Sequence, residues 1–283
     1  QVRRGGPHLM LNDAEIALVA REVKTRSGAV LTKDMAGAIA IRLQPLARRE
    51  GFASVPELIG AARIRADGAL WSAIADNLAQ SDTRFFRDRS QFEKLRTTLL
   101  PDALKRRAHE RVRIWSAGCA TGQEAYSIAM IVDEMRNEGL NPAIEIVATD
   151  LSERLLDKAR AGLYTQFEIQ RGLPIRKLIA YFEKAGDLWR ISDRLRAGVK
   201  FEPHNLMKHP GQLGQFDVIM LAHVLPSFDQ ETRIDVLRRA ADALTPNGLL
   251  LLGAGETLPE GCDVFALEGG VARKPNAARV AAA

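Results

Sequence analysis

Apolar positions recur with helical spacing through the first eighty residues. Ile16, Val19 and Val23 fall on one face of a segment that Asn12 or Asp13 can cap. Similar segments begin near Asp34, Ser54 and Gly68. No β-type run separates these segments, so we expect an all-α N-terminal domain over residues 11–83 and a linker helix over 84–110.

The pattern changes at residue 111 to short apolar runs separated by helical segments. The runs at 112–116, 144–149, 216–221 and 249–252 are predicted strands. Strands that alternate with helices predict a parallel sheet with helices on both faces, here over residues 111–270. Over about 165–203 the alternation fails, because one helix is followed by two short candidate strands, which predicts a small β insertion.

Composition narrows the class of protein. The 283 residues are 46% apolar and 27% charged, as in ordinary globular proteins. Two cysteines argue against a disulfide framework or a cysteine-built zinc site, so no metal is expected. Because no apolar run approaches about 18 residues, we expect a cytoplasmic protein without membrane insertion. Residues 1–10 resemble an expression tag, and residues 271–283 are expected to form a tail.

Charge is distributed unevenly along the chain. Residues 84–113 hold 10 basic and 4 acidic residues, a net +6, whereas residues 114–283 hold 19 and 22, a net −3. A basic stretch beside a mildly acidic body predicts an acidic partner, either a nucleic acid or an acidic protein surface. An ordinary solvated helix face explains the stretch equally well.

A glycine-containing turn and a carboxylate suggest a nucleoside cofactor. Gly118 and Gly122 follow the first predicted strand, and Asp150 ends the second, where it could accept the hydroxyls of a ribose. The Gly-x-x-x-Gly spacing departs from the dinucleotide fingerprint, which favours S-adenosyl-L-methionine (SAM), a cofactor without phosphate, over NAD. A tight strand–helix turn and a helix-capping role for Asp150 are the structural alternatives.

Five stretches together resemble the CheR-type chemotaxis receptor methyltransferases. They are Ser81–Asp88, Trp115–Ile128, Ala148–Asp150, Ala159–Tyr164 and Leu244–Gly248. The resemblance covers roughly residues 12–268. It implies a SAM-dependent methyltransferase domain of Rossmann-like α/β fold with a small antiparallel β insertion, preceded by an all-α domain. The implied activity is methylation of glutamate side chains on chemoreceptor cytoplasmic helices by a monomer, with S-adenosyl-L-homocysteine as product.

The resemblance also implies roles for particular residues. Arg87 would face the reacting carboxylate, Glu124 would contact the methionine portion of SAM, and Asp150 would hold the ribose. The full implied cofactor set is Ser81, Thr83, Arg87, Gly118, Glu124, Asp150, Asn205, Leu206, His223 and Val224. The residues expected to dock the acidic receptor helix bundle are Arg42, Arg48 and Arg49. The structural alternatives are an exposed surface position for Arg87 and a favourable helix-dipole position for Glu124.

The loop after the third predicted strand departs from the family. Where relatives usually have Cys-Arg-Asn-Val-x-Ile-Tyr-Phe-Asp, this chain has Leu221–Asp229, with His223 in place of Asn and Ser227 in place of Tyr. A catalytically degenerate module that binds SAM and docks to a receptor or regulator is therefore the alternative function. Nucleic acid is not an expected substrate, because no base-flipping motif occurs and aromatics are only 6%. The short turn Glu183–Asp187 predicts recognition that does not need a receptor C-terminal peptide.

Overall fold

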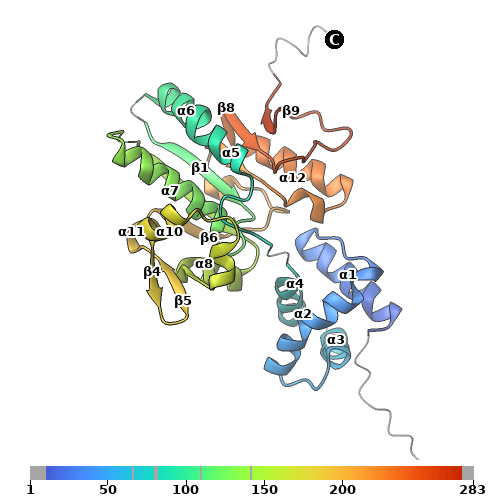
Figure 1. Ribbon diagram of the computed structural model, residues 1–283. Helices are drawn as coiled ribbons and strands as arrows, with labels where there is room; N and C mark the ends of the chain where they lie inside the picture. Colours follow the sequence, from blue (N-terminus) through green and yellow to red (C-terminus); the bar gives the residue numbers. More distant parts are fainter. Residues whose placement is uncertain (1–10, 66, 80–81, 109, 141, 276–283) are drawn as a thin grey trace, which may run out of the picture. The chain divides into compact units, whose positions relative to one another are not determined.

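The computed structural model describes residues 11–275 apart from 66, 80, 81, 109 and 141, and it divides into two compact units (Figure 1). Among the described residues, 11–79 together with 227–229 form the helical unit, and 82–226 with 230–275 form the α/β unit. The predicted tag, Ser81 and residues 276–283 lie outside the described residues.

In the described residues, four α-helices form the helical unit, each beginning near the start of a predicted helical segment. They are α1 (Asp13–Ser27), α2 (Ala36–Arg49), α3 (Val55–Ile64) and α4 (Gly68–Leu78), with a 3-10 turn at Lys33–Met35 before α2. Asn12 accepts a hydrogen bond from the Glu15 backbone N–H and completes a capping box. The predicted apolar faces meet in one core, which includes Val19, Leu43 and Ile74.

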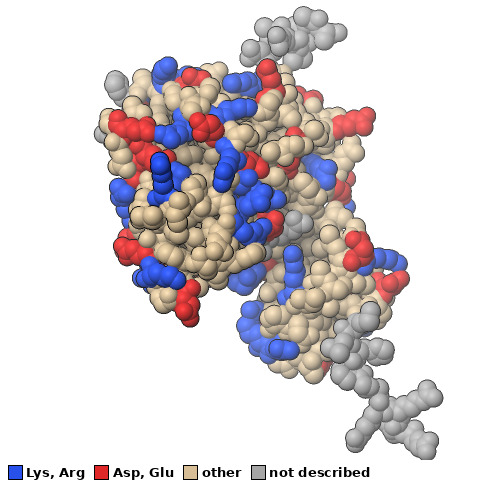
Figure 2. Space-filling model, viewed as in Figure 1, with Lys and Arg blue, Asp and Glu red and all other residues tan. Residues whose placement is uncertain are grey.

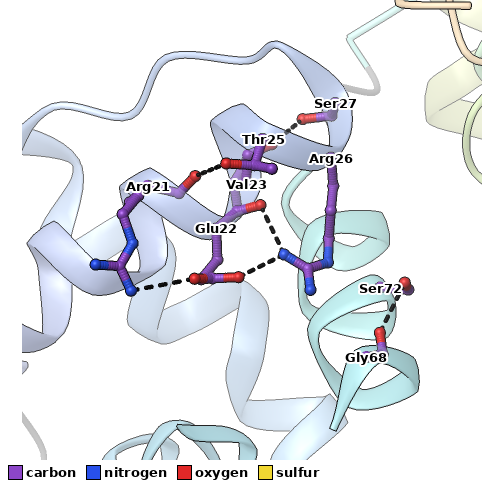
Figure 3. Close-up of polar contacts among 8 residues, drawn as sticks. All are labelled: Arg21, Glu22, Val23, Thr25, Arg26, Ser27, Gly68 and Ser72. Carbon is purple, nitrogen blue, oxygen red and sulfur yellow. Dashed lines mark hydrogen bonds and ion pairs between the residues drawn. The ribbon is translucent and has the colours of Figure 1, made fainter. Parts of the chain in front are cut away.

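Polar contacts hold the exposed side of α1. Figure 3 shows Arg26 donating to the Glu22 carboxylate at 2.5 Å, while Arg21 reaches the same carboxylate at 3.2 Å. The Ser27 hydroxyl donates to the Val23 carbonyl at 2.8 Å. Such contacts are partly solvent-exposed, so the buried apolar face contributes most of the stability of α1.

A seven-stranded sheet forms the centre of the α/β unit, in the order β6-β2-β1-β7-β8-β10-β9. The strands are β1 (Val112–Ala117), β2 (Ile144–Asp150), β6 (Val199–Pro203), β7 (Phe216–Met220), β8 (Leu244–Leu251), β9 (Ala266–Glu268) and β10 (Val271–Arg273). Strands β6, β2, β1, β7 and β8 are parallel, so their carboxyl ends share one edge. This confirms the predicted fold class.

Helices cover both faces of the sheet. The helices that follow the strands are α7 (Gln123–Asn137), α8 (Glu153–Ala161) and α12 (Gln230–Ala243). Along β1, Ile114 belongs to the core that α7 shares, whereas its neighbour Trp115 lines a cleft with Val236 of α12. Because successive strand residues point to opposite faces, α7 and α12 lie on opposite sides of the sheet.

In this sheet, the structure differs from two predicted boundaries, the start of strand β8 and the start of the C-terminal tail. Strand β8 begins at Leu244 instead of residue 249, because Leu244 pairs with Phe216 before a bulge in the ladder. The predicted tail begins with a strand, since Val271 and Ala272 pair with β8 in antiparallel register and are buried. A three-residue strand is too short for a sequence pattern to reveal.

The predicted linker helix over 84–110 is instead built into the α/β unit. It consists of α5 (Arg89–Lys94), a π-helical turn at Leu95–Leu99 and α6 (Leu100–Arg107), and residues 82–88 before it are not helical. Leu95, Leu99 and Leu100 are buried in the main core. The apolar side of this segment therefore packs on the sheet unit, while Arg89, Lys105 and Arg106 are exposed and Arg107 pairs with the buried Asp217.

The predicted insertion forms a second, three-stranded antiparallel sheet. It holds α9 (Gln166–Gln170), α10 (Ile175–Tyr181), β4 (Phe182–Ala185), β5 (Leu188–Ile191) and α11 (Asp193–Ala197), and β3 (Leu163–Tyr164) completes the sheet. The candidate strand at 199–202 is not part of it, because β6 pairs in parallel with β2. Within the described residues, no helix has the length and apolar character needed to cross a membrane.

Candidate functional site

The turn after β1 lies at the carboxyl edge of the sheet and needs a glycine. Gly118 has a left-handed φ of +75°, and a Cβ placed there would lie 2.8 Å from Cγ2 of Val224. Its backbone N–H donates to the Thr149 carbonyl at 2.8 Å, which ties the turn to β2. Gly118 therefore allows the loops after β1 and β7 to approach each other closely.

Asp150 ends β2 and joins this turn to the start of α8. Its Oδ2 accepts the Ala120 backbone N–H at 2.9 Å, and its Oδ1 accepts the Ser152 backbone N–H at 2.9 Å. The side-chain cap of α8 is Ser152, whose hydroxyl accepts the N–H of Leu155. Asp150 thus braces two loops at the carboxyl end of β2.

Glu124, in the first turn of α7, is enclosed next to β1. The Ser116 hydroxyl donates to its Oε1 at 2.6 Å. Burial raises the pKa of the Glu124 carboxyl to about 7; the Ser116 hydrogen bond opposes this rise, and the charges of Asp88 and Glu256 add to it. Because this pKa is close to neutral pH, a cation bound beside Glu124 would shift the carboxyl group to its ionised form.

Arg87 closes a short segment that packs on the sheet unit through two phenylalanines. Phe85 and Phe86 are buried, and the Phe86 backbone N–H donates to the Ser127 hydroxyl at 3.0 Å. The Arg87 guanidinium donates to the Asp82 carbonyl at 2.8 Å, and its charge lowers the pKa of Glu124. Arg87 therefore lies within electrostatic reach of the buried carboxylate.

Three loops meet in a polar cluster that sequence reasoning missed. Nε2 of His223 lies 2.7 Å from Oδ2 of Asp88, and the same oxygen accepts the Ala254 backbone N–H at 2.7 Å. Oε2 of Glu256 accepts the backbone N–H groups of His223 and Gly253, at 2.9 and 2.5 Å. We call Asp88, His223 and Glu256 the loop clasp, because they join the loops before α5, after β7 and after β8.

Backbone strain gathers at the same edge. Among the described residues, the non-glycine residues with positive φ are Phe86, Ala108, Ala120 and His223. Three of the four belong to the segment or loops that carry the candidate site. A non-glycine residue in this region costs on the order of 1–3 kcal/mol and persists only where its surroundings fix it. The N–H bonds to Ser127, Asp150 and Glu256 supply that fixation.

Asn205 and Leu206 lie in the loop after β6. Oδ1 of Asn205 accepts the Met207 backbone N–H at 2.9 Å, which forms a local turn. Leu206 lines an apolar cleft with Ala117 and Leu221, the residues at the ends of β1 and β7.

The structure brings most of the predicted cofactor set to one edge of the α/β unit. Arg87, Gly118, Glu124, Asp150, His223 and Val224 are linked through the contacts above, and Thr83 lies partly buried in the segment that ends at Arg87. Ser81 lies outside the described residues. The predicted docking residues belong to the helical unit, on α2, and all are exposed: Arg42, Arg48 and Arg49.

Charge at this edge fits SAM better than a phosphate-bearing cofactor. The edge presents four carboxylates, Asp88, Glu124, Asp150 and Glu256. Burial raises the pKa of the Cys119 thiol, and the charges of Asp150 and Glu124 add to this rise. Oε1 of Glu256 is buried without a hydrogen-bond partner within the described residues. A sulfonium and an ammonium group suit such a site, whereas a pyrophosphate would be repelled. No cluster of three or more metal-ligating side chains occurs in the described part of the chain.

Comparison with known proteins identifies the family. Residues 81–272 match the SAM-binding domain of the CheR methyltransferases. The chain is 35% identical to chemotaxis protein methyltransferase 1 of Pseudomonas aeruginosa, an alignment that covers 87% of this chain and 91% of that protein. It is 35% identical to the chemotaxis protein methyltransferase of Vibrio parahaemolyticus, covering 91% and 94%, and 32% identical to that of Escherichia coli, covering 88% and 86%. The chain therefore belongs to the CheR methyltransferase family.

Proposed function

We propose that this protein is a cytoplasmic enzyme that transfers a methyl group from SAM to glutamate carboxylates on the cytoplasmic helices of chemoreceptors. The observation that carries the proposal is the carboxyl edge where Gly118, Glu124 and Asp150 converge, with Arg87 within electrostatic reach. The chemotaxis methyltransferases of three bacteria, similar over most of their length, support the class of substrate.

The cofactor roles follow from the chemistry of each contact. Asp150 accepts the ribose hydroxyls, because its carboxylate lies at the end of β2, between the turn after β1 and the start of α8. Glu124 pairs with the ammonium group of the methionine portion. Backbone at Gly118 approaches the donor closely since it has no side chain. The residues that complete the cofactor set are Ser81, Thr83, Asn205, Leu206, His223 and Val224.

The reaction needs no general base from the protein. SAM supplies an electrophilic methyl group on a sulfonium sulfur and is converted to S-adenosyl-L-homocysteine. A glutamate side chain with a pKa near 4.3 is already ionised at neutral pH, so it can attack directly. The protein's contribution is to align the carboxylate with the donor and to exclude water. Arg87 orients the incoming carboxylate, with a guanidinium geometry suited to two parallel hydrogen bonds.

Receptor docking involves the basic side of α2 in this proposal. Arg42, Arg48 and Arg49 are exposed on α2, and an acidic helix bundle is the complementary surface. Their contribution should fall with ionic strength, because exposed charges are screened. We propose a monomer as the acting form, and a receptor's C-terminal peptide is not needed for recognition.

A test should separate binding from turnover. Isothermal titration with SAM measures the first, and transfer of a tritium-labelled methyl group to receptor-containing membranes measures the second. Arg87→Ala should lower methyl transfer at saturating SAM far more than it lowers SAM affinity. Arg190→Ala is the control, because Arg190 is an exposed arginine on β5 in the same unit. Equal transfer by the two variants would contradict the role of Arg87.

The alternative function is a degenerate module that binds SAM or S-adenosyl-L-homocysteine and regulates a partner without methylating it. One feature favours it: the Arg87 guanidinium is already engaged by a neighbour, since it donates to the Asp82 carbonyl. Tight SAM binding with no transferred label on any receptor preparation would establish this alternative and refute the enzyme.

A further inference from the structure

Large apolar side chains are exposed together in the insertion. Phe167 of α9 is 66% exposed, and Ile175 and Ile179 of α10 are 66% and 77% exposed. Ile175 and Ile179 are four residues apart, so they share one face of α10. Of the five large exposed apolar residues described in the α/β unit, these three fall within thirteen positions. We call them the α9–α10 ridge. Grouped exposure of this kind marks a contact surface more often than scattered exposure does.

The ridge is fastened to the segment that carries Arg87. Arg171, which follows α9, forms an ion pair with Asp82 at 2.8 Å. At Gly172 a Cβ would lie 2.2 Å from the Phe85 carbonyl oxygen, so the turn before α10 packs directly on this segment. Lys177 of α10 lies 5.0 Å from the centre of the Phe86 ring. Whatever docks on the ridge therefore lies next to the segment that ends at Arg87.

Positive charge borders the ridge. Arg84 and Arg176 are exposed, and the Arg171 guanidinium lies 5.5 Å from the centre of the Phe167 ring. Figure 2 shows an uncharged area where Figure 1 draws α10, with Lys and Arg side chains along its borders. An apolar strip with a cationic border is complementary to an α-helix whose apolar stripe is flanked by Asp and Glu.

The contacts of Asp82 indicate how the basic border of the α9–α10 ridge would hold a carboxylate from a docked protein. Its exposed carboxylate is bound by Arg171 at 2.8 Å and lies 3.6 Å from Arg87. The hydrogen bond from Arg171 is the main cause that lowers the pKa of Asp82, and the charges of Arg171 and Arg87 add to it. Two guanidinium groups that already share one carboxylate form a ready position for a carboxylate from a docked helix.

We propose that the α9–α10 ridge docks the substrate helix of the receptor, the helix that bears the reacting glutamate. The inference rests on the proposed function, and it adds a docking surface in the α/β unit to the basic residues of α2. The apolar stripe of the helix packs on Phe167, Ile175 and Ile179, while acidic residues beside the stripe meet Arg171, Arg176 and Arg84. The reacting glutamate is thereby delivered along the segment to Arg87.

The double substitution Ile175→Ser and Ile179→Ser tests the ridge in the full-length protein. Both side chains are already in solvent, so the melting temperature and the SAM dissociation constant should match the wild type. The KM for a receptor cytoplasmic fragment should rise about five-fold or more, with kcat nearly unchanged, because docking contacts are lost and chemistry is not. Leu140→Ser is the matched control, since Leu140 is 51% exposed in the same unit and follows α7, outside the insertion.

A binding measurement keeps the proposal testable apart from turnover. Biolayer interferometry with the immobilised receptor fragment, in the presence of S-adenosyl-L-homocysteine, should show the same loss for the double variant and none for Leu140→Ser. Unchanged receptor affinity and KM in the double variant would overturn the ridge and leave the proposed function intact. If the wild-type protein binds the fragment through the ridge but transfers no methyl group, the proposed methyltransferase activity is refuted. Docking of the receptor helix on the ridge is then still supported.

Self-association is the competing occupant of the ridge. If sedimentation velocity shows a wild-type dimer that the double variant loses, while receptor affinity is unchanged, the ridge is an interface between two copies and the docking proposal is overturned.

Discussion

Glu124 gives the sharpest prediction, because its role and its protonation state are linked. Burial raises the pKa of Glu124 to about 7, so the unliganded protein holds this carboxyl largely protonated at pH 6. An ammonium group that binds beside it requires the ionised form. SAM affinity should therefore rise with pH across this range.

The magnitude follows from the titration of one group. With a pKa of about 7, the ionised fraction of Glu124 is roughly one tenth at pH 6 and about three quarters at pH 7.5. If binding requires both the ionised carboxylate and the ammonium form of SAM, whose amine has an ordinary pKa of about 7.7–8.0, the SAM association constant should increase about five- to six-fold between these two pH values. The range stays below the pH at which the amine of SAM loses most of its proton.

Stability responds to the same group with the opposite sign. Between pH 4.5 and 7 the folded protein retains a proton that the unfolded chain has lost, because the pKa of Glu124 is raised on folding. The stability that this group contributes therefore falls as pH rises to 7 and is constant above it. The two effects of pH can therefore be distinguished: between pH 6 and 7 the SAM affinity should rise, whereas the stability that Glu124 contributes to the unliganded protein should fall.

Isothermal titration at pH 6, 6.5, 7 and 7.5 measures the effect directly. Glu124→Gln keeps an acceptor for the Ser116 hydroxyl but cannot titrate, so its SAM affinity should be weak and nearly flat with pH. Glu183→Gln, at an exposed position on β4, is the control and should follow the wild type. A wild-type affinity that does not change from pH 6 to 7.5 would refute the pairing of Glu124 with the ammonium group.

Three further predictions concern the carboxyl edge and the helical core. Asp88→Asn should lower kcat/KM about ten- to hundred-fold, since a charged hydrogen-bond partner contributes about 1.5–3 kcal/mol; an unchanged value would exclude the loop clasp from positioning Arg87. His223→Asn should retain most SAM binding by titration and His223→Val should lose it, because branched side chains resist positive φ. Leu43→Ala, in the core of the helical unit, should reduce the free energy of unfolding by about 3 kcal/mol in urea titrations.

Local patterns were sufficient to predict the parallel sheet and the glycine turn after β1. Strand β1, Gly118 and the start of α7 are adjacent in sequence, so one short stretch contains the whole turn. Asp150 could be placed at the same edge because parallel strands end together. The predicted boundaries failed where pairing decides the structure, as at β8, whose first residue Leu244 is fixed by Phe216 on another strand.

The loop clasp could not be predicted in this way. Asp88 and His223 are 135 positions apart, and Glu256 follows another 33 positions later, so no spacing rule connects them. The one available signal was Gly253, a glycine directly after a buried strand, where a Cβ would lie 2.7 Å from both His223 and Glu256. That signal indicates a close approach but does not name the partners.

The clasp also explains why the departure at His223 is compatible with a working site. The position has φ +61°, and Asn and His are among the non-glycine residues that adopt this region most readily. Replacing the family's Asn by His therefore preserves the backbone of the loop, and the Glu256 carboxylate still receives its N–H. The imidazole of His223 is larger than an Asn side chain, and the contact of its Nε2 with Asp88 at 2.7 Å restrains its orientation. Since Asp88 directly follows Arg87, the same contact that restrains the new side chain also fixes the segment that presents the arginine, which favours an active enzyme over a degenerate module.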